Sequence, residues 1–368
     1  MAQGEDQKVI CFFNSCKAWG GGEKWHFEMA QRLLAEGMQV IMCAAPDTRL
    51  AQRARAAGIP LYEFRIGNLS FLNPFLKARL SRFFKRMDVT HIVLNLPADL
   101  KAAGIAARSA GVPDIVYRRG SAIPISNTWL NRFLFKKVVD RVLANSEETR
   151  RTILQKNGNF IDPERIKVIY NGIELDRFDA EETEHFEREG HAVILGNLGR
   201  LEAQKNQLFL LDVAEILRER GYNFSLKIGG DGRLREMLER EINNRSLQEY
   251  VHLTGFVDDV KSFMNHIDIF LLSSLWEGFG YVLVEAQACK KPIVAFDISS
   301  NPEVVSHKKN GLLVPVNDKE AFADAVMQLI DDEKARELMG RNGRQRTQRM
   351  FDIKQTTKNL IEFFQPGF

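Results

Sequence analysis

The sequence has few cysteines and no long apolar run, and both absences narrow the classes of protein that it can encode. Only four of the 368 residues are cysteines, at 11, 16, 43 and 289. This spread fits neither a disulfide framework nor a metal site, so we expect buried thiols in a reducing cytosol. No apolar stretch approaches the roughly 20 residues of a membrane-spanning helix, and the polar first residues lack an export signal. We therefore expect a cytoplasmic protein.

A dinucleotide-binding fingerprint is also missing. The glycine-rich turn at 229–232 reads Gly-Gly-Asp-Gly rather than Gly-x-Gly-x-x-Gly. No suitably placed acidic residue follows it within a first βαβ unit. A dinucleotide-dependent oxidoreductase is therefore the weakest of the interpretations that we consider.

Length and charge indicate two domains of different character. A chain of 368 residues is longer than a single hydrophobic core usually supports, so two domains are expected. Its 45% hydrophobic and 27% charged residues are ordinary globular values. Residues 1–185 carry 27 Lys+Arg against 21 Asp+Glu, a net charge of +6, whereas the remainder carries 24 against 27, a net charge of −3. The basic half suggests an anionic partner such as a membrane surface or an acidic acceptor. The alternative is that this imbalance is scatter around zero.

Short apolar runs alternate with amphipathic segments along the first half. An apolar run at 9–13, a helical pattern at 23–36 and a second apolar run at 40–44 form a βαβ unit, which implies parallel strands. Further strands are expected near residue 61 and at 91–94, 114–117 and 142–144, and the run at 168–172 closes the first domain.

The alternation begins again after a highly charged stretch at 176–190, which we interpret as a linker. Strands are expected at 192–197, 224–228, 251–253, 267–272 and 293–296, and helices at 207–220, 234–243, 281–289, 321–330 and 353–364. The predicted fold class is α/β, with two Rossmann-like doubly wound domains that bind ligands beyond the carboxyl ends of their strands. We place the domains at 1–185, with a C-terminal helix at about 350–368, and at 186–349.

The stretch 273–285 joins an apolar strand to a helix through a glycine-bearing loop. Backbone N–H groups at a helix start attract phosphate, and Gly278 and Gly280 allow close approach of a ligand. Glu277 and Glu285 flank this helix start, and each carboxylate can accept hydrogen bonds from a pair of hydroxyls. The stretch therefore predicts a site for a phosphorylated ligand that carries hydroxyls.

A second motif follows the first strand of the second half. Gly199, Arg200 and Lys205 lie on a strand-to-helix loop, where both cations can reach one anion. Alone, such a loop is more often a solvated basic surface. Its predicted position at the same sheet edge as Glu277 and Glu285 favours an anion site.

Together these motifs resemble the signature of the retaining GT-B glycosyltransferases of family 4, also called glycosyl transferases group 1. The shared pattern is two glutamates separated by seven residues with Gly-Phe-Gly between them, and the Gly-Arg…Lys-Asn run at 199–206. The resemblance implies the GT-B fold, in which two Rossmann-like domains face across a cleft and a C-terminal helix crosses back to the first. It also implies a hexosyltransferase-type enzyme that moves a sugar from a nucleotide-diphosphate sugar to an acceptor with retention of anomeric configuration.

The resemblance assigns roles to residues of the second domain. Arg200 and Lys205 would bind the donor's diphosphate, Glu277 the transferred sugar and Glu285 the ribose, and the catalytic residues would be Glu277, Arg200 and Lys205. The full predicted donor site comprises Gly199, Arg200, Lys205, Gly255, Phe256, Glu277, Gly278, Phe279, Gly280, Tyr281 and Glu285.

In the first domain the matches are shorter. The glycine loop before the first helix would meet a phosphate or the acceptor through its N–H groups. Two asparagines match positions that line the cleft of relatives. The predicted acceptor or phosphate site comprises Gly20, Gly21, Gly22, Glu23, Arg119, Asn145 and Asn171.

Arg119 marks a departure from the family pattern. Many relatives place a histidine in the loop after the strand expected at 114–117, where this sequence reads Arg-Arg-Gly-Ser. An arginine cannot act as a general base near neutral pH, although it can bind a leaving phosphate or an acidic acceptor. We therefore name no catalytic histidine and expect His26 and His91 to be structural.

No Asp-x-Asp pair is present, which metal-dependent transferases of the other major fold use. Cations and a helix start can stabilise a leaving diphosphate in place of a metal ion. We expect no metal and no other cofactor. The expected partners are a nucleotide-sugar donor and a glycan, lipid-linked or lipopolysaccharide-type acceptor, and we expect no nucleic acid.

Two segments mix aromatic residues with cations, at 71–86 and 129–137. A basic amphipathic helix suggests contact with a membrane surface, whereas the alternative is a core-facing helix with a solvated basic edge. Membrane contact would place the protein peripherally at the inner face of the membrane and would favour a lipid-linked acceptor.

Two further interpretations stay open. A sugar-nucleotide epimerase on the same fold would release nucleoside diphosphate and epimerised sugar without an acceptor. A non-catalytic nucleotide-sugar-binding protein would bind the donor without turnover.

Overall fold

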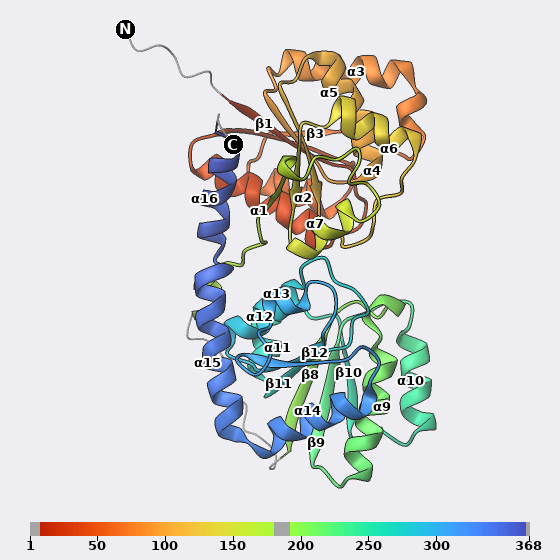
Figure 1. The fold of residues 1–368 in the computed structure, drawn as a ribbon, viewed down its shortest axis with the longest axis vertical. Coiled ribbons are helices and arrows are strands. Elements are labelled where there is room, and N and C mark those ends of the chain that lie inside the picture. The colour runs from red at the N-terminus through yellow and green to blue at the C-terminus, as the bar shows by residue number, and fades with distance from the viewer. Residues whose placement is uncertain (1–7, 180–191, 366–368) are drawn as a thin grey trace. The chain divides into compact units, whose positions relative to one another are not determined.

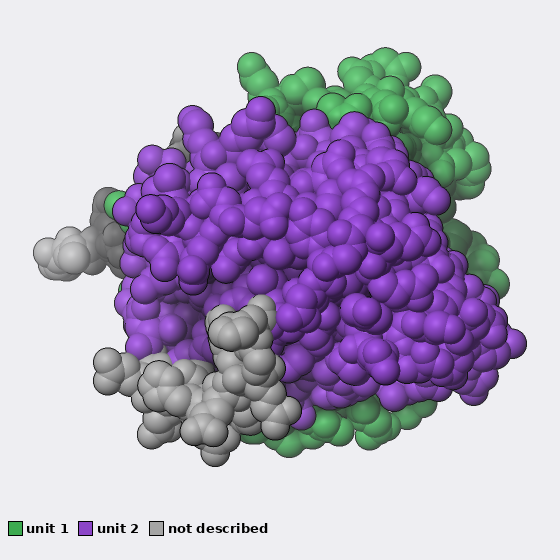
Figure 2. Space-filling model, turned by 90° about the horizontal axis from the view of Figure 1, so that it is seen from below, with its two compact units in different colours: residues 1–171, 356–368 green, residues 172–355 purple. Residues whose placement is uncertain are grey.

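The computed structural model describes residues 8–179 and 192–365 (Figure 1). The chain forms two compact units, of which unit 1 comprises residues 1–171 and 356–368 and unit 2 comprises 172–355 (Figure 2). Each unit contains one parallel sheet with helices packed against it, which confirms the predicted α/β class. The predicted boundary between residues 185 and 186 lies outside the described residues and stays a prediction.

The sheet of unit 1 has seven strands in the order β3-β2-β1-β4-β5-β6-β7, and every neighbouring pair is parallel. Central strands are buried on both faces, which explains why they appear in the sequence as continuous apolar runs. The strands are β1 (Val9–Asn14), β2 (Gln39–Ala44), β3 (Leu61–Glu63), β4 (His91–Leu94), β5 (Asp114–Arg119), β6 (Arg141–Ala144) and β7 (Ile166–Val168).

Side-chain caps define the starts of several helices in unit 1. Helix α3, for example, begins where Asn73 accepts hydrogen bonds from the N–H groups of Phe75 and Leu76, with Pro74 in the first turn. The helices are α1 (Gly21–Ala35), α2 (Arg49–Ala56), α3 (Pro74–Arg86), α4 (Pro97–Asp99), α5 (Ile105–Ala110), α6 (Trp129–Phe133) and α7 (Glu147–Leu154).

The sheet of unit 2 has six parallel strands in the order β10-β9-β8-β11-β12-β13. The strands are β8 (Val193–Leu198), β9 (Phe224–Gly229), β10 (Val251–Gly255), β11 (Ile269–Leu272), β12 (Ile293–Phe296) and β13 (Gly311–Val314). No strand was expected at β13, a short edge strand that within the sheet pairs only with β12 among the described residues.

The helices of unit 2 include the longest one that the structure describes, α15, where no helix was expected from the sequence. They are α8 (Asp176–Asp179), α9 (Gln207–Glu219), α10 (Arg235–Asn244), α11 (Val260–Asn265), α12 (Tyr281–Ala288), α13 (Asn301–Val304), α14 (Lys319–Asp331), α15 (Glu333–Met350) and α16 (Ile353–Phe363). No helix among the described residues combines the length and apolar character needed to cross a bilayer.

Helix α16 is the predicted C-terminal helix, and it belongs to both units. It begins in unit 2, and from Thr356 onward its residues belong to unit 1. The Thr356 hydroxyl donates to the carbonyl of Tyr170 at 3.1 Å, and Lys8 Nζ donates to the carbonyl of Phe364 at 2.9 Å. The guanidinium of Arg141 donates to the Phe363 carbonyl. Unit 1 is therefore closed by a segment that follows unit 2 in the sequence.

Candidate functional site

Three loops at the carboxyl edge of the unit 2 sheet carry most of the predicted donor residues. The loop after β8 is joined to the loop after β11, because Ser273 Oγ donates to the carbonyl of Lys205 at 2.9 Å. The N–H of Leu275 donates to the carbonyl of Gln204 at 2.9 Å, and Gln204 Nε2 donates to that of Trp276 at 2.8 Å. These bonds fix the two loops to one another at the edge where parallel sheets bind ligands.

An ion pair between Lys205 and Glu277 lies at the junction of these loops. Lys205 Nζ is 2.5 Å from Glu277 Oε1, and the two side chains are 16% and 9% exposed. The backbone of Glu277 is held from the loop after β12, where the hydroxyls of Ser299 and Ser300 donate to its carbonyl at 2.6 and 3.3 Å. Both charged residues were predicted for the site, but their pairing was not.

Arg200 supplies a second cation to the loop after β8. Its side chain is exposed to solvent. Its backbone is anchored, because Gln207 Nε2 donates to the Arg200 carbonyl at 3.0 Å. The structure therefore offers an exposed guanidinium and a paired ammonium on one short loop.

Glycines of the turn at 229–232 are required by close packing against that loop. Gly230 has φ +130°, and a Cβ atom built on it would lie 1.9 Å from the carbonyl oxygen of Gly199. A Cβ atom on Gly232 would lie 2.5 Å from the carbonyl oxygen of Leu201. The N–H of Gly230 donates to the carbonyl of Gly255 at 2.7 Å. The turn thus supports the cation-bearing loop through its backbone.

The predicted residues around the start of α12 differ in exposure. Gly280 caps the helix with φ +76°, a left-handed conformation that favours glycine. The Phe279 ring is buried against Tyr281 and Phe351, with ring centroids 5.7 and 5.4 Å away, so its side chain serves packing. Glu285 lies partly buried within α12.

Gly278 and Phe256 complete the predicted donor residues. Gly278 lies in the loop between β11 and α12 and is partly buried. Phe256 follows β10, and its side chain is 65% exposed. An exposed aromatic ring beside the sheet edge is available to contact a flat ligand group.

In unit 1, the predicted glycine loop is partly helical. Gly21 and Gly22 form the first turn of α1, and Gly20 is its N-cap, so the expectation of a loop through residue 22 is corrected. Glu23 is buried in this turn, and its Oε1 accepts hydrogen bonds from the amides of Asn14 at 3.2 Å and Asn95 at 3.3 Å. The positive end of α1 therefore already holds a carboxylate of the chain itself.

The two arginines expected in a loop after the fifth strand are the last residues of β5. They stay in the strand because they pair with Leu143 and Ala144 of β6. Arg119 donates to the carbonyl of Ile123 at 2.9 Å, so its guanidinium folds back on the following loop.

Arg118, which the sequence analysis did not single out, is the buried member of this pair. Its guanidinium lies 4.5 Å from the centroid of the Trp25 ring. It donates to the amide oxygens of Asn95 at 3.3 Å and Asn171 at 3.2 Å. The predicted residue Asn171 is thus 2% exposed and already engaged by a cation of the chain.

Asn145 is likewise occupied by neighbouring groups. Its Nδ2 donates to the carbonyl of Gly120 at 3.3 Å, and its Oδ1 accepts from Thr149 Oγ1 at 2.9 Å. These bonds join the loops after β5 and β6. In this structure Asn145 therefore holds the backbone of the loop after β5 in place.

A second missed group is the buried carboxyl of Asp99. Its Oδ1 accepts a 2.5 Å hydrogen bond from Ser15 Oγ, and its Oδ2 accepts from the N–H groups of Ser15 and Leu96. Burial raises the pKa of Asp99 to about 7, because desolvation outweighs these hydrogen bonds. Pro97, at the first position of a helical turn with an acid two residues later, was the local signal available.

The two histidines considered earlier are embedded in unit 1. His26 is fully buried between the rings of Phe12 and Trp25, and burial, together with the charge of Arg118, lowers its pKa well below the usual range. Burial also lowers the pKa of His91, whose Nδ1 lies 2.8 Å from Thr90 Oγ1. Within residues 8–179 and 192–365 no cluster of three or more His, Cys, Asp or Glu side chains is arranged to hold a metal ion.

Comparison with known families covers both units. Residues 19–177 match the model of Glycosyltransferase Family 4, and residues 179–346 match the model of Glycosyl transferases group 1. Together the two models account for most of the chain.

Two curated relatives show the breadth of the sequence similarity. The Escherichia coli UDP-Gal:alpha-D-GlcNAc-diphosphoundecaprenol alpha-1,3-galactosyltransferase is 26% identical, over 71% of this chain and 71% of its own. The Campylobacter jejuni N-acetylgalactosamine-N,N'-diacetylbacillosaminyl-diphospho-undecaprenol 4-alpha-N-acetylgalactosaminyltransferase is 26% identical, over 80% of this chain and 82% of its own.

Solved structures share the fold. HepE of Anabaena, in complex with UDP and glucose, superposes with a TM-score of 0.82 at 22% identity, covering 96% of this chain and 98% of HepE. A glycosyltransferase from Rickettsia africae gives a TM-score of 0.85 at 19% identity, covering 97% of this chain and 98% of its own. With both family models matched in order along the sequence, this chain belongs to the GT-B glycosyltransferases, as a member of family 4 and group 1.

Proposed function

We propose that this glycosyltransferase moves a sugar from a nucleotide-diphosphate sugar to a lipid-linked or polysaccharide acceptor, with retention and without a metal ion. The observation that carries the proposal is the ion pair of Lys205 and Glu277, on loops fixed to one another beside Arg200 and the start of α12. The named relatives that use diphosphoundecaprenol-linked sugars, and the UDP and glucose of HepE, support the substrate classes.

Leaving-group stabilisation follows from the cations of the loop after β8. When the bond to the sugar breaks, negative charge develops on the diphosphate. In this proposal Arg200, Lys205 and the positive end of α12 stabilise it. Lys205 would then contact both the diphosphate and Glu277. Retention in this proposal means that the acceptor attacks on the face that the leaving group vacates, without an enzyme nucleophile.

Sugar and ribose recognition falls to the two glutamates. The Glu277 carboxylate pairs with Lys205, and it retains capacity to accept hydrogen bonds from the transferred sugar. Glu285, on α12, would accept from the ribose hydroxyls. Both assignments rest on the family resemblance together with the position of these carboxylates at one sheet edge.

The acceptor end of unit 1 suits hydroxyls better than phosphate. Glu23 already places a carboxylate at the positive end of α1, and a second anion there would meet like charge. A carboxylate held by two amides accepts hydrogen bonds from acceptor hydroxyls without reorganising. We therefore assign Glu23 to binding of the acceptor's sugar.

Exposed apolar residues of unit 1 support attachment to a membrane surface. Leu72, in the turn before α3, and Phe75, in the first turn of α3, are 66% and 85% exposed, and Trp129 at the start of α6 is 78% exposed. Cations follow each cluster in the sequence, among them Lys77 and Lys136. Aromatic rings beside lysines are the composition of interfacial helices, so we propose peripheral attachment to an anionic membrane that carries the acceptor.

The donor site is tested by thermal unfolding against a panel of nucleoside diphosphates and nucleotide sugars. A ligand at 100 times its Kd raises the unfolding free energy by about 2.7 kcal/mol. We expect a shift with one base, lost in Arg200→Ala and Glu285→Ala and kept in Arg233→Ala, an exposed cation that pairs with Glu202. Shifts that persist in Arg200→Ala and Glu285→Ala would show that the donor binds elsewhere.

Membrane attachment is tested by flotation with liposomes containing phosphatidylglycerol at low salt. We expect the wild type to float and Phe75→Ser with Trp129→Ser to stay in solution. Leu338→Ser, which removes a residue of unit 2 that is 53% exposed, is the matched control. A wild type that fails to float at low salt would refute peripheral attachment.

Turnover distinguishes the transferase from the two other interpretations. A transferase consumes donor in proportion to acceptor, an epimerase converts donor with no acceptor present, and a binding protein shows a thermal shift but no turnover. The named relatives favour the transferase.

A further inference from the structure

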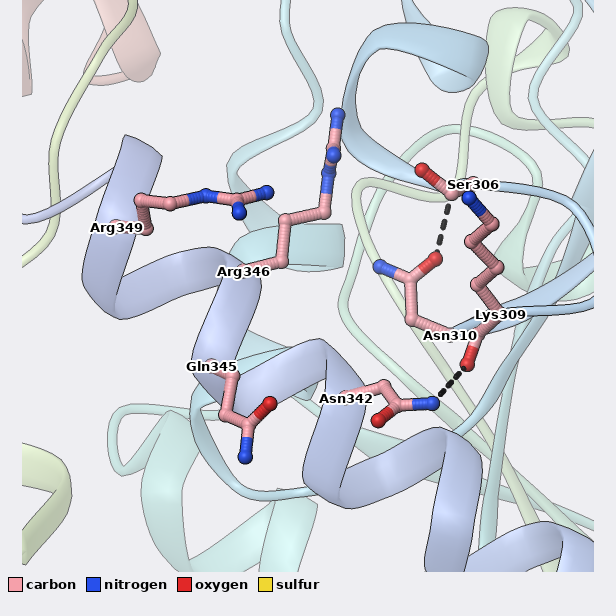
Figure 3. Close-up of a pocket in the computed structure, with 7 residues that line it drawn as sticks. All are labelled: Ser306, Lys309, Asn310, Asn342, Gln345, Arg346 and Arg349. Atoms are coloured by element: carbon pink, nitrogen blue, oxygen red, sulfur yellow. Dashed lines mark hydrogen bonds between the residues drawn. The ribbon is translucent and has the colours of Figure 1, made fainter.

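A basic pocket lies in unit 2 between α15 and the loop that leads into β13 (Figure 3). Its volume is about 270 Å³. Three cations and several neutral hydrogen-bonding side chains line it, including Lys309, Arg346, Arg349, Ser306, Asn310 and Asn342. In Figure 3 the two arginines extend from neighbouring positions of α15, and the lysine comes from the loop on the other side.

The walls of the pocket are fixed by hydrogen bonds. Asn342 Nδ2 donates to the carbonyl of Lys309 at 2.8 Å, which ties α15 to the loop (Figure 3). The guanidinium of Arg346 donates to the carbonyls of Glu303 at 2.6 Å and Val304 at 3.0 Å. Because these groups are already positioned, a ligand would meet little additional cost of ordering.

The charges of the pocket are not balanced within its lining. No aspartate or glutamate lines it. On other faces of α15, Arg341 pairs with Glu337 at 3.3 Å and Arg344 with Asp179 at 2.6 Å. Among the described residues, no carboxylate forms an ion pair with Lys309 or Arg349. The charges of Lys309 and Arg349 therefore repel each other unless an anion lies between them.

We propose that this pocket binds a small phosphate-bearing anion at a site separate from the donor loops. Guanidinium forks match phosphate oxygens, and the asparagine and serine side chains supply further donors. No aromatic side chain lines the pocket, so it has no platform on which to stack a nucleobase. Residues 306–310 lead into the amino end of β13, whereas the donor loops follow the carboxyl ends of β8, β11 and β12, so the two sites lie toward opposite edges of the parallel sheet. The ligand class is thus inorganic phosphate or a phosphate monoester rather than a nucleotide.

Calorimetric titration of the full chain with inorganic phosphate, at low ionic strength, tests the proposal. We expect Lys309→Gln with Arg349→Gln to weaken binding at least about tenfold, because each charged hydrogen bond contributes about that factor. The matched control is Lys334→Gln with Arg341→Gln, which removes two exposed cations from α15 outside the pocket. If both double variants weaken phosphate binding equally, the loss of affinity comes from the change in net charge alone, and the proposal is wrong.

Arg200→Ala separates this site from the donor site. We expect phosphate binding in the pocket to survive in that variant, whether or not the donor assignment is correct. Phosphate binding that is abolished by Arg200→Ala and unaffected by the pocket variant would also overturn the proposal.

The source of the phosphate is identified by two further titrants. Binding of glucose 1-phosphate that is lost in the pocket variant would indicate a soluble sugar phosphate. Binding of vesicles of phosphatidylcholine with phosphatidylglycerol, lost in the same variant, would indicate a lipid headgroup. Absence of binding by phosphate and by both titrants would refute the site.

Discussion

The carboxyl edges of the two sheets organise their polar residues in opposite ways. In unit 2, Lys205 and Glu277 form one ion pair on loops, and Arg200 beside them is exposed. In unit 1, Glu23 and Arg118 are buried and already engaged by asparagine side chains. Unit 2 thus presents an exposed guanidinium beside a largely buried ion pair, whereas unit 1 holds its cation and its carboxylate in a buried amide network.

This contrast explains why the family signature lies in unit 2. A phosphate and a ribose are common to all nucleotide-sugar donors, so a few charged loop residues at fixed spacing can recognise them. Acceptors differ among the relatives, and a satisfied polar network can be adjusted by small changes around it. We expect substitutions in unit 2 to affect chemistry first, and substitutions in unit 1 to affect stability first.

The largest expected effect is on catalysis, from Glu277→Gln. In our proposal this carboxylate contacts the transferred sugar, and it pairs with Lys205, so its removal should lower kcat/KM by about 100-fold or more, as loss of a positioned transition-state contact does. Glu202→Gln, on the same loop as Lys205 but paired with exposed Arg233, should stay within about twofold. Steady-state kinetics of the two variants measures this difference. Equal activities would show that Glu277 is not part of the donor site.

The next effect is on stability, from Lys205→Met. This substitution leaves the 9% exposed Glu277 side chain without its cation, which should lower the free energy of unfolding by about 3 kcal/mol. The double variant with Glu277→Gln should recover part of that loss, because no unpaired charge is left. Urea unfolding of the two single variants and the double variant measures the coupling. Strictly additive losses would show that the pair carries no interaction energy.

A smaller loss is expected from Gly230→Ala. The new Cβ atom would lie 1.9 Å from the Gly199 carbonyl, so the backbone must shift, at a cost of about 2 kcal/mol. Gly37→Ala is the control, since its φ of +81° is also left-handed but nothing lies within 4 Å of the new atom. Both variants place a side chain at a positive φ, and Gly230→Ala adds the close contact, so we expect the larger loss of unfolding free energy from Gly230→Ala. If Gly230→Ala and Gly37→Ala lose the same free energy of unfolding, the close packing of Gly230 against Gly199 does not contribute to stability.

The smallest expected effect is in unit 1, where Asp99 should make the free energy of unfolding depend on pH. Because burial raises the pKa of Asp99 to about 7, the folded state holds a proton that the unfolded state releases near its ordinary pKa of 3.8. The stability that this proton contributes is complete below that ordinary pKa and is lost as pH rises through about 7. Between pH 6 and 8 the wild type should lose about 1 kcal/mol relative to Asp99→Asn.

The exposed Asp47 offers the control for that measurement. Its side chain is 93% exposed, so Asp47→Asn should leave the slope of stability against pH unchanged. A wild type and an Asp99→Asn variant with parallel pH profiles would show that the Asp99 carboxyl titrates normally.

Hydrophobic pattern predicted most strands and several helices but failed at α15. That method finds helices that bury an apolar face, whereas α15 packs through small residues. A Cβ atom on Gly340 would lie 2.0 Å from the carbonyl oxygen of Lys290, and one on Gly343 would lie 3.0 Å from Gln287 Cγ. Close approach through glycines replaces apolar burial there, so its sequence is rich in charge and has few apolar residues.

Prediction of the candidate site was also limited to features that lie within one segment of the sequence. Spacing within one segment, such as that of Glu277 and Glu285, is visible in a sequence, and it led to the donor loops. Contacts between distant segments are not, because they depend on which strands become neighbours. The Lys205–Glu277 pair joins residues 72 positions apart, and the Ser15–Asp99 bond joins residues 84 apart.

The division of α16 between the units has a consequence for biosynthesis. Residues Thr356 onward complete unit 1, and the whole of unit 2 is translated between them and the rest of that unit. At the usual rates of translation, the first 171 residues wait roughly ten to forty seconds for the segment that closes them. Unit 2, which is continuous in the sequence, has no such delay. On the ribosome, the unit that is translated first is therefore the one that is completed last, and during this interval it is the part most in need of a chaperone.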